Sequence, residues 1–184
     1  MIYQHKVLQK QGISNYQIQK LIKEKKLYFI EAGIYSTEEK INYLEYIMKK
    51  HPNVVFTLTT ACYFYGLTKR KEDRYIVATK QKDRKIKDEK VKQIFMKDNL
   101  YIIGKCNIKY KNIDIAIYDL ERILIEIVRN KTSIDFEMYK EIIGNYKKIS
   151  KLINKKKLES YLINFKNEKI KLRINKEVFN SGDY

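Results

Sequence analysis

The residues of this sequence that could support catalysis are few and far apart. Cys62 and Cys106 are the only cysteines, and His5 and His51 are the only histidines. No standard spacing for a zinc site or for a cysteine–histidine nucleophile can be formed from that set. The 6 glycines include no G-x-G arrangement, so the sequence has no glycine-rich phosphate loop. We therefore expect no metal, no cofactor, and thiols that stay reduced.

The acidic residues give no better case for an enzyme. Asp88–Lys90 imitates the D-x-K end of a nuclease motif, but such a triplet is expected by chance in a lysine-rich chain. Asp119, Glu121 and Glu126 fall in the first part of a predicted helix, where the helix dipole favours carboxylates without any catalytic purpose. We predict that the chain is not an enzyme. An enzyme that processes RNA or DNA is kept as an alternative to the non-enzymatic functions given below.

Side chains suited to contacting nucleic acid gather near the N-terminus, on a predicted helix from Ser14 to about Glu24. Ile18, Leu21 and Ile22 share its apolar face. Amides can pair with adenine, and lysines can meet guanine or phosphate. The candidate DNA-binding residues are Asn15, Tyr16, Gln17, Gln19, Lys20, Lys23, Lys25 and Lys26.

The elements around this helix follow the order of a winged helix-turn-helix. A short helix is expected from Ile2 to Lys10 and ends at Gly12, and Ser14 is a good N-cap for the next helix. Two β-prone runs then flank Glu31–Gly33 and predict a hairpin. In a helix-turn-helix the second helix enters the major groove. The polar surface of a solvated helix is the alternative interpretation of the same residues.

Positive charge is concentrated in two further stretches, within a formal net charge of +17. One runs from Lys80 to Lys92. The other supplies a candidate surface for an acidic or nucleotide-bearing partner, made of Lys147, Lys148, Lys151, Lys155, Lys156 and Lys157. An excess of this size favours a polyanionic partner such as nucleic acid. Solvated helix faces explain each stretch equally well, and no basic amphipathic helix supports a membrane role.

The rest of the chain alternates between helical and β-rich patterns. A helix is predicted from Glu38 to Lys50, and Pro52 after it marks the domain boundary. A buried helix is predicted over Thr57–Tyr65. Strands are expected over 74–78, 94–96, 100–106, 108–110 and 113–118, with a hairpin turn at Lys111–Asn112. Helices are expected from Asp119 to Arg129, Asp135 to Tyr146, Asn154 to Phe165 and Asn167 to Phe179.

Several segments, in this order, resemble the AbiEi-type antitoxins of bacterial type IV abortive-infection toxin–antitoxin systems. Gly12–Ser14 and Gly33–Tyr35 resemble the winged-helix opening of that family. Thr60–Thr68 resembles its "alanine-leucine … glycine-leucine-threonine" segment, and Ile117–Glu126 its "valine-tyrosine-aspartate … glutamate-arginine-threonine … aspartate" segment. The similarity extends over roughly Gly12 to Phe165, and its weight lies in the order and spacing of the segments.

The resemblance implies a repressor of its own operon that counters a nucleotidyltransferase-like toxin without forming a stable complex with it. The sequence departs from the family in three ways. Its N-terminal module is one helix short, its wing tip has Glu31-Ala32 where a basic residue is common, and Ile123 and Glu126 replace threonine and aspartate. The wing is therefore not expected to contact phosphate, and positions 123 and 126 are expected to be structural.

We therefore expect an α+β protein with two domains. Residues 1–51 would form an abbreviated winged helix-turn-helix, and residues 52–184 an antitoxin domain with a small, mostly antiparallel sheet and a helical tail. The expected partners are the inverted repeats of its own promoter and the toxin. The expected location is the cytoplasm, with no membrane association. The alternative function is a protein-interaction module that acts through the basic C-terminal half without specific DNA binding.

Overall fold

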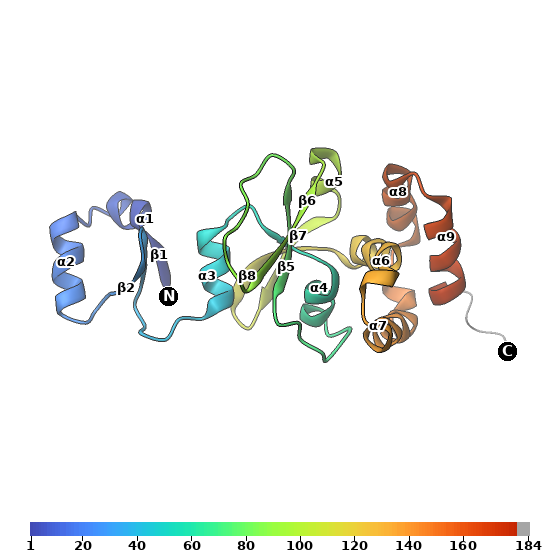
Figure 1. Cartoon of the computed structure of the whole chain (residues 1–184), viewed down its shortest axis with the longest axis horizontal. Helices are drawn as coiled ribbons and strands as arrows, with labels where there is room; N and C mark the ends of the chain where they lie inside the picture. The colour runs from blue at the N-terminus through green and yellow to red at the C-terminus, as the bar shows by residue number, and fades with distance from the viewer. Residues whose placement is uncertain (180–184) are drawn as a thin grey trace. The chain divides into compact units, whose positions relative to one another are not determined.

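The computed structural model describes residues 1–179 of the chain, which divides into two compact units, Met1–Asn53 and Val54–Tyr184. Both units combine helices with a small β-sheet, which confirms the predicted α+β class (Figure 1). Within residues 1–179, every helix is too short or too polar to cross a membrane. Because each unit has its own sheet, the two are described separately.

The first unit is built on a three-stranded antiparallel sheet with strand order β1-β3-β2. Its elements are β1 (Ile2–Gln4), α1 (His5–Lys10), α2 (Asn15–Lys23), β2 (Tyr28–Glu31), β3 (Ile34–Ser36) and α3 (Tyr43–Lys50). The predicted hairpin is present, and Gly33 takes a φ of +80° at its turn. That conformation is easily reached only by glycine.

Two predicted boundaries in this unit are wrong. The helix expected from Ile2 begins only at His5, because Ile2–Gln4 pairs with Ile34–Ser36 as a strand. The helix expected from Glu38 begins at Tyr43, where the side chain of Asn42 accepts a hydrogen bond from Leu44 N at 3.0 Å. Asn42 therefore supplies the N-cap that this helix needs.

The core of the first unit lies between the two short helices and the sheet. Its buried residues are Leu8, Ile18, Leu27 and Tyr35, with Tyr3, Ile13, Leu21 and Ile22 packed around them. A core of this size uses only one face of α2. The opposite face of the helix is exposed to solvent.

The second unit contains a five-stranded sheet in the order β6-β5-β4-β8-β7. Its strands are β4 (Val55–Phe56), β5 (Tyr75–Lys80), β6 (Val91–Met96), β7 (Lys105–Tyr110) and β8 (Ile113–Tyr118). The prediction of a mostly antiparallel sheet is wrong. β5 pairs with β6 in parallel over six residue pairs, from Tyr75↔Val91 to Lys80↔Met96, and β4 also pairs with β8 in parallel. The lysine-rich connection 81–90 carries the chain back to the starting end of β5 and so forces the parallel pairing.

The hairpin between β7 and β8 agrees with its sequence signal. Tyr110 pairs with Ile113, and Lys111 and Asn112 take φ values of 47° and 66°. Two consecutive residues with positive φ form the turn whose twist matches that of a hairpin. β8 then continues into a buried stretch, Ile115–Tyr118, which makes it a central strand of the sheet.

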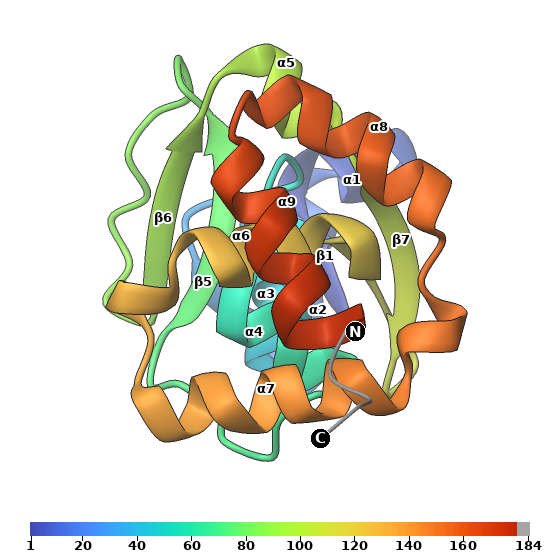
Figure 2. The same ribbon diagram turned by 90° about the vertical axis from the view of Figure 1, so that its right-hand side faces the viewer.

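The remaining helices gather on one side of this sheet, as Figures 1 and 2 both show. They are α4 (Leu58–Phe64), α5 (Asp98–Ile102), α6 (Leu120–Arg129), α7 (Phe136–Lys148), α8 (Lys155–Phe165) and α9 (Glu168–Ile174), with a π-helical turn at Asn175–Phe179. The strand predicted over 100–106 is wrong at its start, because Asp98–Ile102 forms α5 and β7 begins only at Lys105. α8 and α9 pack on α6, which is buried from Glu121 to Val128 and is the central helix of the unit.

Candidate nucleic-acid interface

α2 begins at a capping box that fixes the orientation of the helix. Ser14 Oγ accepts a hydrogen bond from Gln17 N at 3.3 Å, and Gln17 Oε1 accepts one from Ser14 N at 2.7 Å. The two side chains thereby satisfy two backbone N–H groups that would otherwise lack partners at the helix start. Ile18, which is 1% exposed, anchors the same turn in the core. The outward face of α2 is therefore held by a rigid first turn.

That outward face carries a continuous stripe of four predicted DNA-binding residues. Tyr16, Gln19, Lys20 and Lys23 occupy positions i, i+3, i+4 and i+7 of the helix, so they share one face. All four are exposed, and the Tyr16 side chain is 79% exposed. Within residues 1–179 their polar groups make no hydrogen bond or ion pair with another side chain. We call these four residues the α2 stripe.

The other four predicted residues lie outside the stripe. Asn15 Oδ1 is 2.8 Å from His5 Nε2, and Gln17 is used by the capping box. Lys26 Nζ pairs with Glu24 Oε2 at 2.8 Å. Lys25 is exposed, with a φ of 54°, at the residue that terminates the helix in a Schellman motif. The sequence already contained the signal for Gln17, because Ser14-x-x-Gln17 is the spacing of a capping box.

The hairpin of the first unit carries one acid, Glu31, which is paired with a lysine. Glu31 accepts hydrogen bonds from Tyr46 Oη and Lys50 Nζ, both at 2.8 Å. Burial alone would raise the pKa of Glu31, but these two hydrogen bonds outweigh it and hold the pKa below its usual value. The carboxylate therefore keeps its charge inside an ion pair.

Five of the six lysines predicted as a partner-binding surface are exposed to solvent. They are Lys147, Lys148, Lys151, Lys155 and Lys156. Lys157 is different, because its Nζ lies 3.0 Å from Asp119 Oδ2 and 3.2 Å from Glu121 Oε2. Burial disfavours its ammonium, yet the two carboxylates raise the pKa of Lys157 above its usual value. Lys157 therefore joins α8 to the start of α6, which distinguishes it from the other five lysines of the predicted surface.

Glu121 has a structural role beyond that of an acid near a helix start. Its side chain is 8% exposed and accepts a hydrogen bond from Asn154 N at 2.9 Å. Asn154 is the N-cap of α8, and its own side chain accepts from Lys157 N. Glu121 and Lys157 therefore join the beginnings of two helices.

A feature that sequence reasoning missed is a buried ion pair in α6. Arg122 NH2 lies 2.8 Å from Glu126 Oε1, and the two side chains are 0% and 3% exposed. The other N–H groups of Arg122 point to Glu126 Oε1, the carbonyls of Leu100 and Ile103, and Met96 Sδ. All five donors of the guanidinium therefore have acceptors, which leaves none for a ligand. The i, i+4 spacing of arginine and glutamate was the available signal.

The thiols lie in environments unlike those of catalytic cysteines. Cys62 is fully buried, and burial raises the pKa of its thiol. Cys106 is partly buried beside Tyr65, and burial raises its pKa as well. Reactive cysteines need a lowered pKa. Within residues 1–179, no group of three histidine, cysteine or carboxylate side chains could hold a metal ion.

The triplet Asp88–Lys90 lies in the connection between β5 and β6. Asp88 Oδ1 accepts a hydrogen bond from Lys90 N at 3.0 Å, which is a local turn contact.

Among the predicted DNA-binding residues, the fold brings those of the α2 stripe together on one surface. Comparison of the chain with protein-family models and with curated proteins found no match.

Proposed function

We propose that this chain binds duplex DNA through α2 and represses the operon that encodes it. The observation that carries the proposal is the α2 stripe, because it places a tyrosine, an amide and two lysines on one exposed face of a helix held by its first turn. The order β1, α1, α2, β2, β3 supports an abbreviated winged helix-turn-helix, in which α2 would be the recognition helix.

The proposal gives each member of the stripe a role. Gln19 would pair with adenine in the major groove, and Tyr16, near the helix start, would contact the thymine methyl or the phosphate backbone. Lys20 and Lys23 would contact phosphates or guanine. The hairpin adds little positive charge, since Glu31 and Lys50 neutralise each other. We therefore assign most of the binding to α2.

We further propose that the second unit acts as an antitoxin against a nucleotidyltransferase-like toxin. The support is the resemblance of Thr60–Thr68 and Ile117–Glu126 to the AbiEi-type family. The lysines that remain exposed on α7, α8 and the turn between them could meet an acidic or nucleotide-bearing target. In this proposal the protein needs no stable complex with the toxin.

A second function is favoured by the same lysines. The protein would be an interaction module without specific DNA binding. It would bind an acidic partner protein through Lys147, Lys148, Lys151, Lys155 and Lys156. The two functions differ in one observable. A module of this kind would copurify with its partner in a stable complex, whereas a repressor would bind its own promoter in the absence of any other protein.

Fluorescence anisotropy tests the leading proposal with DNA from the region upstream of the gene and a scrambled duplex of equal length. We expect the upstream duplex to bind more tightly, with an affinity that falls as salt rises. Gln19→Ala with Lys20→Ala should abolish that preference. Lys40→Ala is the matched control, since Lys40 is an exposed lysine of the same unit outside α2. A double variant that binds the upstream duplex as tightly as the parent would exclude α2 as the reading surface.

A further inference from the structure

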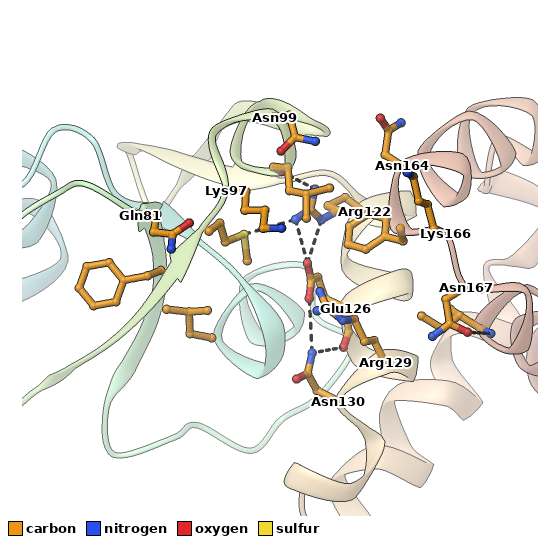
Figure 3. Close-up of a pocket in the computed structure, with 16 residues that line it drawn as sticks. Gln81, Lys97, Asn99, Arg122, Glu126, Arg129, Asn130, Asn164, Lys166 and Asn167 are labelled. Carbon is orange, nitrogen blue, oxygen red and sulfur yellow. Dashed lines mark hydrogen bonds and ion pairs between the residues drawn. The ribbon is translucent and has the colours of Figure 1, made fainter.

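A large polar pocket opens in the second unit beside the buried Arg122–Glu126 pair. It has a volume of about 740 Å³, which lies within the range of small-molecule sites. Residues from β6, α5, α6, α8 and α9 line it. Figure 3 shows side chains from these elements around one space. The pocket is far larger than a single inorganic ion requires.

The pocket carries an excess of positive charge. Lys97, Arg129 and Lys166 line it, and none of them has a carboxylate partner within residues 1–179. The one carboxylate in the lining is Glu126, and its charge is taken up by Arg122. In Figure 3 the three cations lie around that pair. The lining therefore presents three uncompensated cations to any ligand.

One side of the pocket is formed by Arg122, and contacts within the protein hold this side chain in place. The Arg122 guanidinium lies over two rings, with its Cζ 4.5 Å from the Tyr118 centroid and 4.6 Å from the Phe165 centroid. Its five donors are used by the protein, so it cannot turn toward a ligand. Gly104 lies so close that a Cβ added to it would be 2.6 Å from Arg122 Cβ. The Arg122 side of the pocket is therefore preorganised.

Side-chain amides supply both hydrogen-bond donors and acceptors around the pocket. Gln81 and Asn99 are exposed in the lining, with no partner for their side chains within residues 1–179. Asn164 donates from Nδ2 to Ser160 O, so its Oδ1 remains an acceptor. Asn167 accepts from Ile170 N, so its Nδ2 remains a donor. This set of groups can match the edge of a nucleobase.

The pocket also contains apolar surface suited to a flat ring. Ile94, Leu100 and Ile170 line it, as does Phe95, which is 45% exposed. A ligand that bears only phosphate would leave this surface and the amides without contacts. A ligand with both a ring and phosphates would use the whole lining.

We propose that this pocket binds a nucleoside phosphate as a small molecule. The three cations hold the phosphates, the amides contact the base edge, and the apolar surface receives the base. The proposal concerns the second unit alone and is independent of DNA binding by α2. A mononucleotide is favoured over a nucleic-acid strand because the volume corresponds to one small ligand.

Isothermal titration calorimetry of the full chain with ATP, adenosine and pyrophosphate, without added metal, tests the proposal. We expect ATP to bind about tenfold or more tightly than either adenosine or pyrophosphate, because only ATP engages both halves of the pocket. Arg129→Gln, Lys97→Gln and Lys166→Asn should each weaken ATP binding by about tenfold. Asparagine is chosen at position 166 because Lys166 has a φ of 47°, which asparagine tolerates.

Lys85→Gln and Lys87→Gln are the matched controls, because both lysines are exposed and lie outside the lining. They remove the same charge and should leave ATP binding unchanged. Absence of ATP binding at millimolar concentration would overturn the proposal. So would equal losses in the control and pocket variants, or pyrophosphate binding as tight as that of ATP. Tighter binding of a short single-stranded oligonucleotide than of ATP would overturn the small-molecule assignment.

Discussion

Arg122 and Glu126 form a salt bridge of 2.8 Å on one face of α6, and both side chains are buried. The pair lies one helical turn apart, and Asn130, a further turn along, donates to Glu126 Oε2 at 3.3 Å. Arg122 also donates to the carbonyls of Leu100 and Ile103, which flank the C-terminal end of α5. One arginine therefore fixes the segment between β6 and β7 against the central helix.

The first prediction is that breaking this pair destabilises the second unit strongly. Glu126→Met leaves a buried guanidinium without a counter-ion and should cost about 3–5 kcal/mol in the free energy of unfolding. Arg122→Met with Glu126→Met should cost less than Glu126→Met alone, because no charge is then left buried. Urea unfolding followed by circular dichroism measures both. Arg129→Met, an exposed change on the same helix, should stay within about 0.5 kcal/mol. A loss below about 1 kcal/mol for Glu126→Met would contradict this interpretation.

The second prediction concerns the pH dependence of a contact between α7 and the segment that follows α4. Glu141 accepts hydrogen bonds from Lys69 N at 3.0 Å and from Thr68 Oγ1 at 2.8 Å, and these lower the pKa of its carboxyl group. A lowered pKa in the folded state stabilises the protein above the ordinary value of 4.5, and this contribution is lost as the pH falls through the folded pKa.

Glu141→Gln should therefore lower the free energy of unfolding at pH 7 by about 1 kcal/mol and flatten its decline below pH 4.5. Glu137→Gln is the control, since Glu137 is an exposed acid on the same helix, 3.7 Å from Lys140. Thermal unfolding between pH 2 and pH 7 measures the difference. Identical pH profiles for Glu141→Gln and the parent would show that this contact does not couple to protonation.

The third prediction separates two glutamines two positions apart on α2. Gln17 belongs to the capping box and Gln19 to the α2 stripe. Gln17→Ala should lower the stability of the first unit by about 0.5–1 kcal/mol and weaken binding to the upstream and scrambled duplexes alike. Gln19→Ala should leave the melting temperature unchanged and cost about 1–3 kcal/mol for the upstream duplex alone. Circular dichroism and anisotropy on the same samples measure both. The opposite assignment of effects would show that Gln17 is the reader.

The elements that the sequence predicted well are those with local signals. Asp119, Asp135, Asn154 and Asn167 each cap a helix, and each side chain accepts a backbone hydrogen bond in the first turn. The Lys111–Asn112 turn is equally local. These features depend on a few neighbouring residues, so a single sequence is enough to predict them.

The features that the sequence did not predict depend on distant pairing. Ile2–Gln4 is a strand only because it pairs with Ile34–Ser36, and the pairing of β5 with β6 in parallel depends on the path of the connection 81–90. An apolar run such as Leu100–Ile103 suits a helix or a strand equally. In the site, periodicity placed the α2 stripe on one face, but the partners of Asn15, Lys26 and Lys157 appear only in three dimensions.

The last prediction is that protection from the toxin belongs to the second unit. A fragment from Pro52 onward retains the five-stranded sheet and the whole of α6, whose buried residues form its core. We expect it to fold, to lose promoter binding and to protect cells that express the partner toxin. Lys155→Glu with Lys156→Glu should reduce protection without lowering the melting temperature, because exposed charges contribute little to stability.

Lys157→Glu is the comparison variant, because it is expected to change stability as well as surface charge. It would place a third carboxylate beside Asp119 and Glu121, where the parent has an ammonium 3.0 Å and 3.2 Å from them. We expect this variant to lose stability, so a loss of protection in it would say nothing about the surface. Two results would refute the assignment of protection to the second unit. One is a folded fragment that gives no protection, and the other is full protection by residues 1–51 alone.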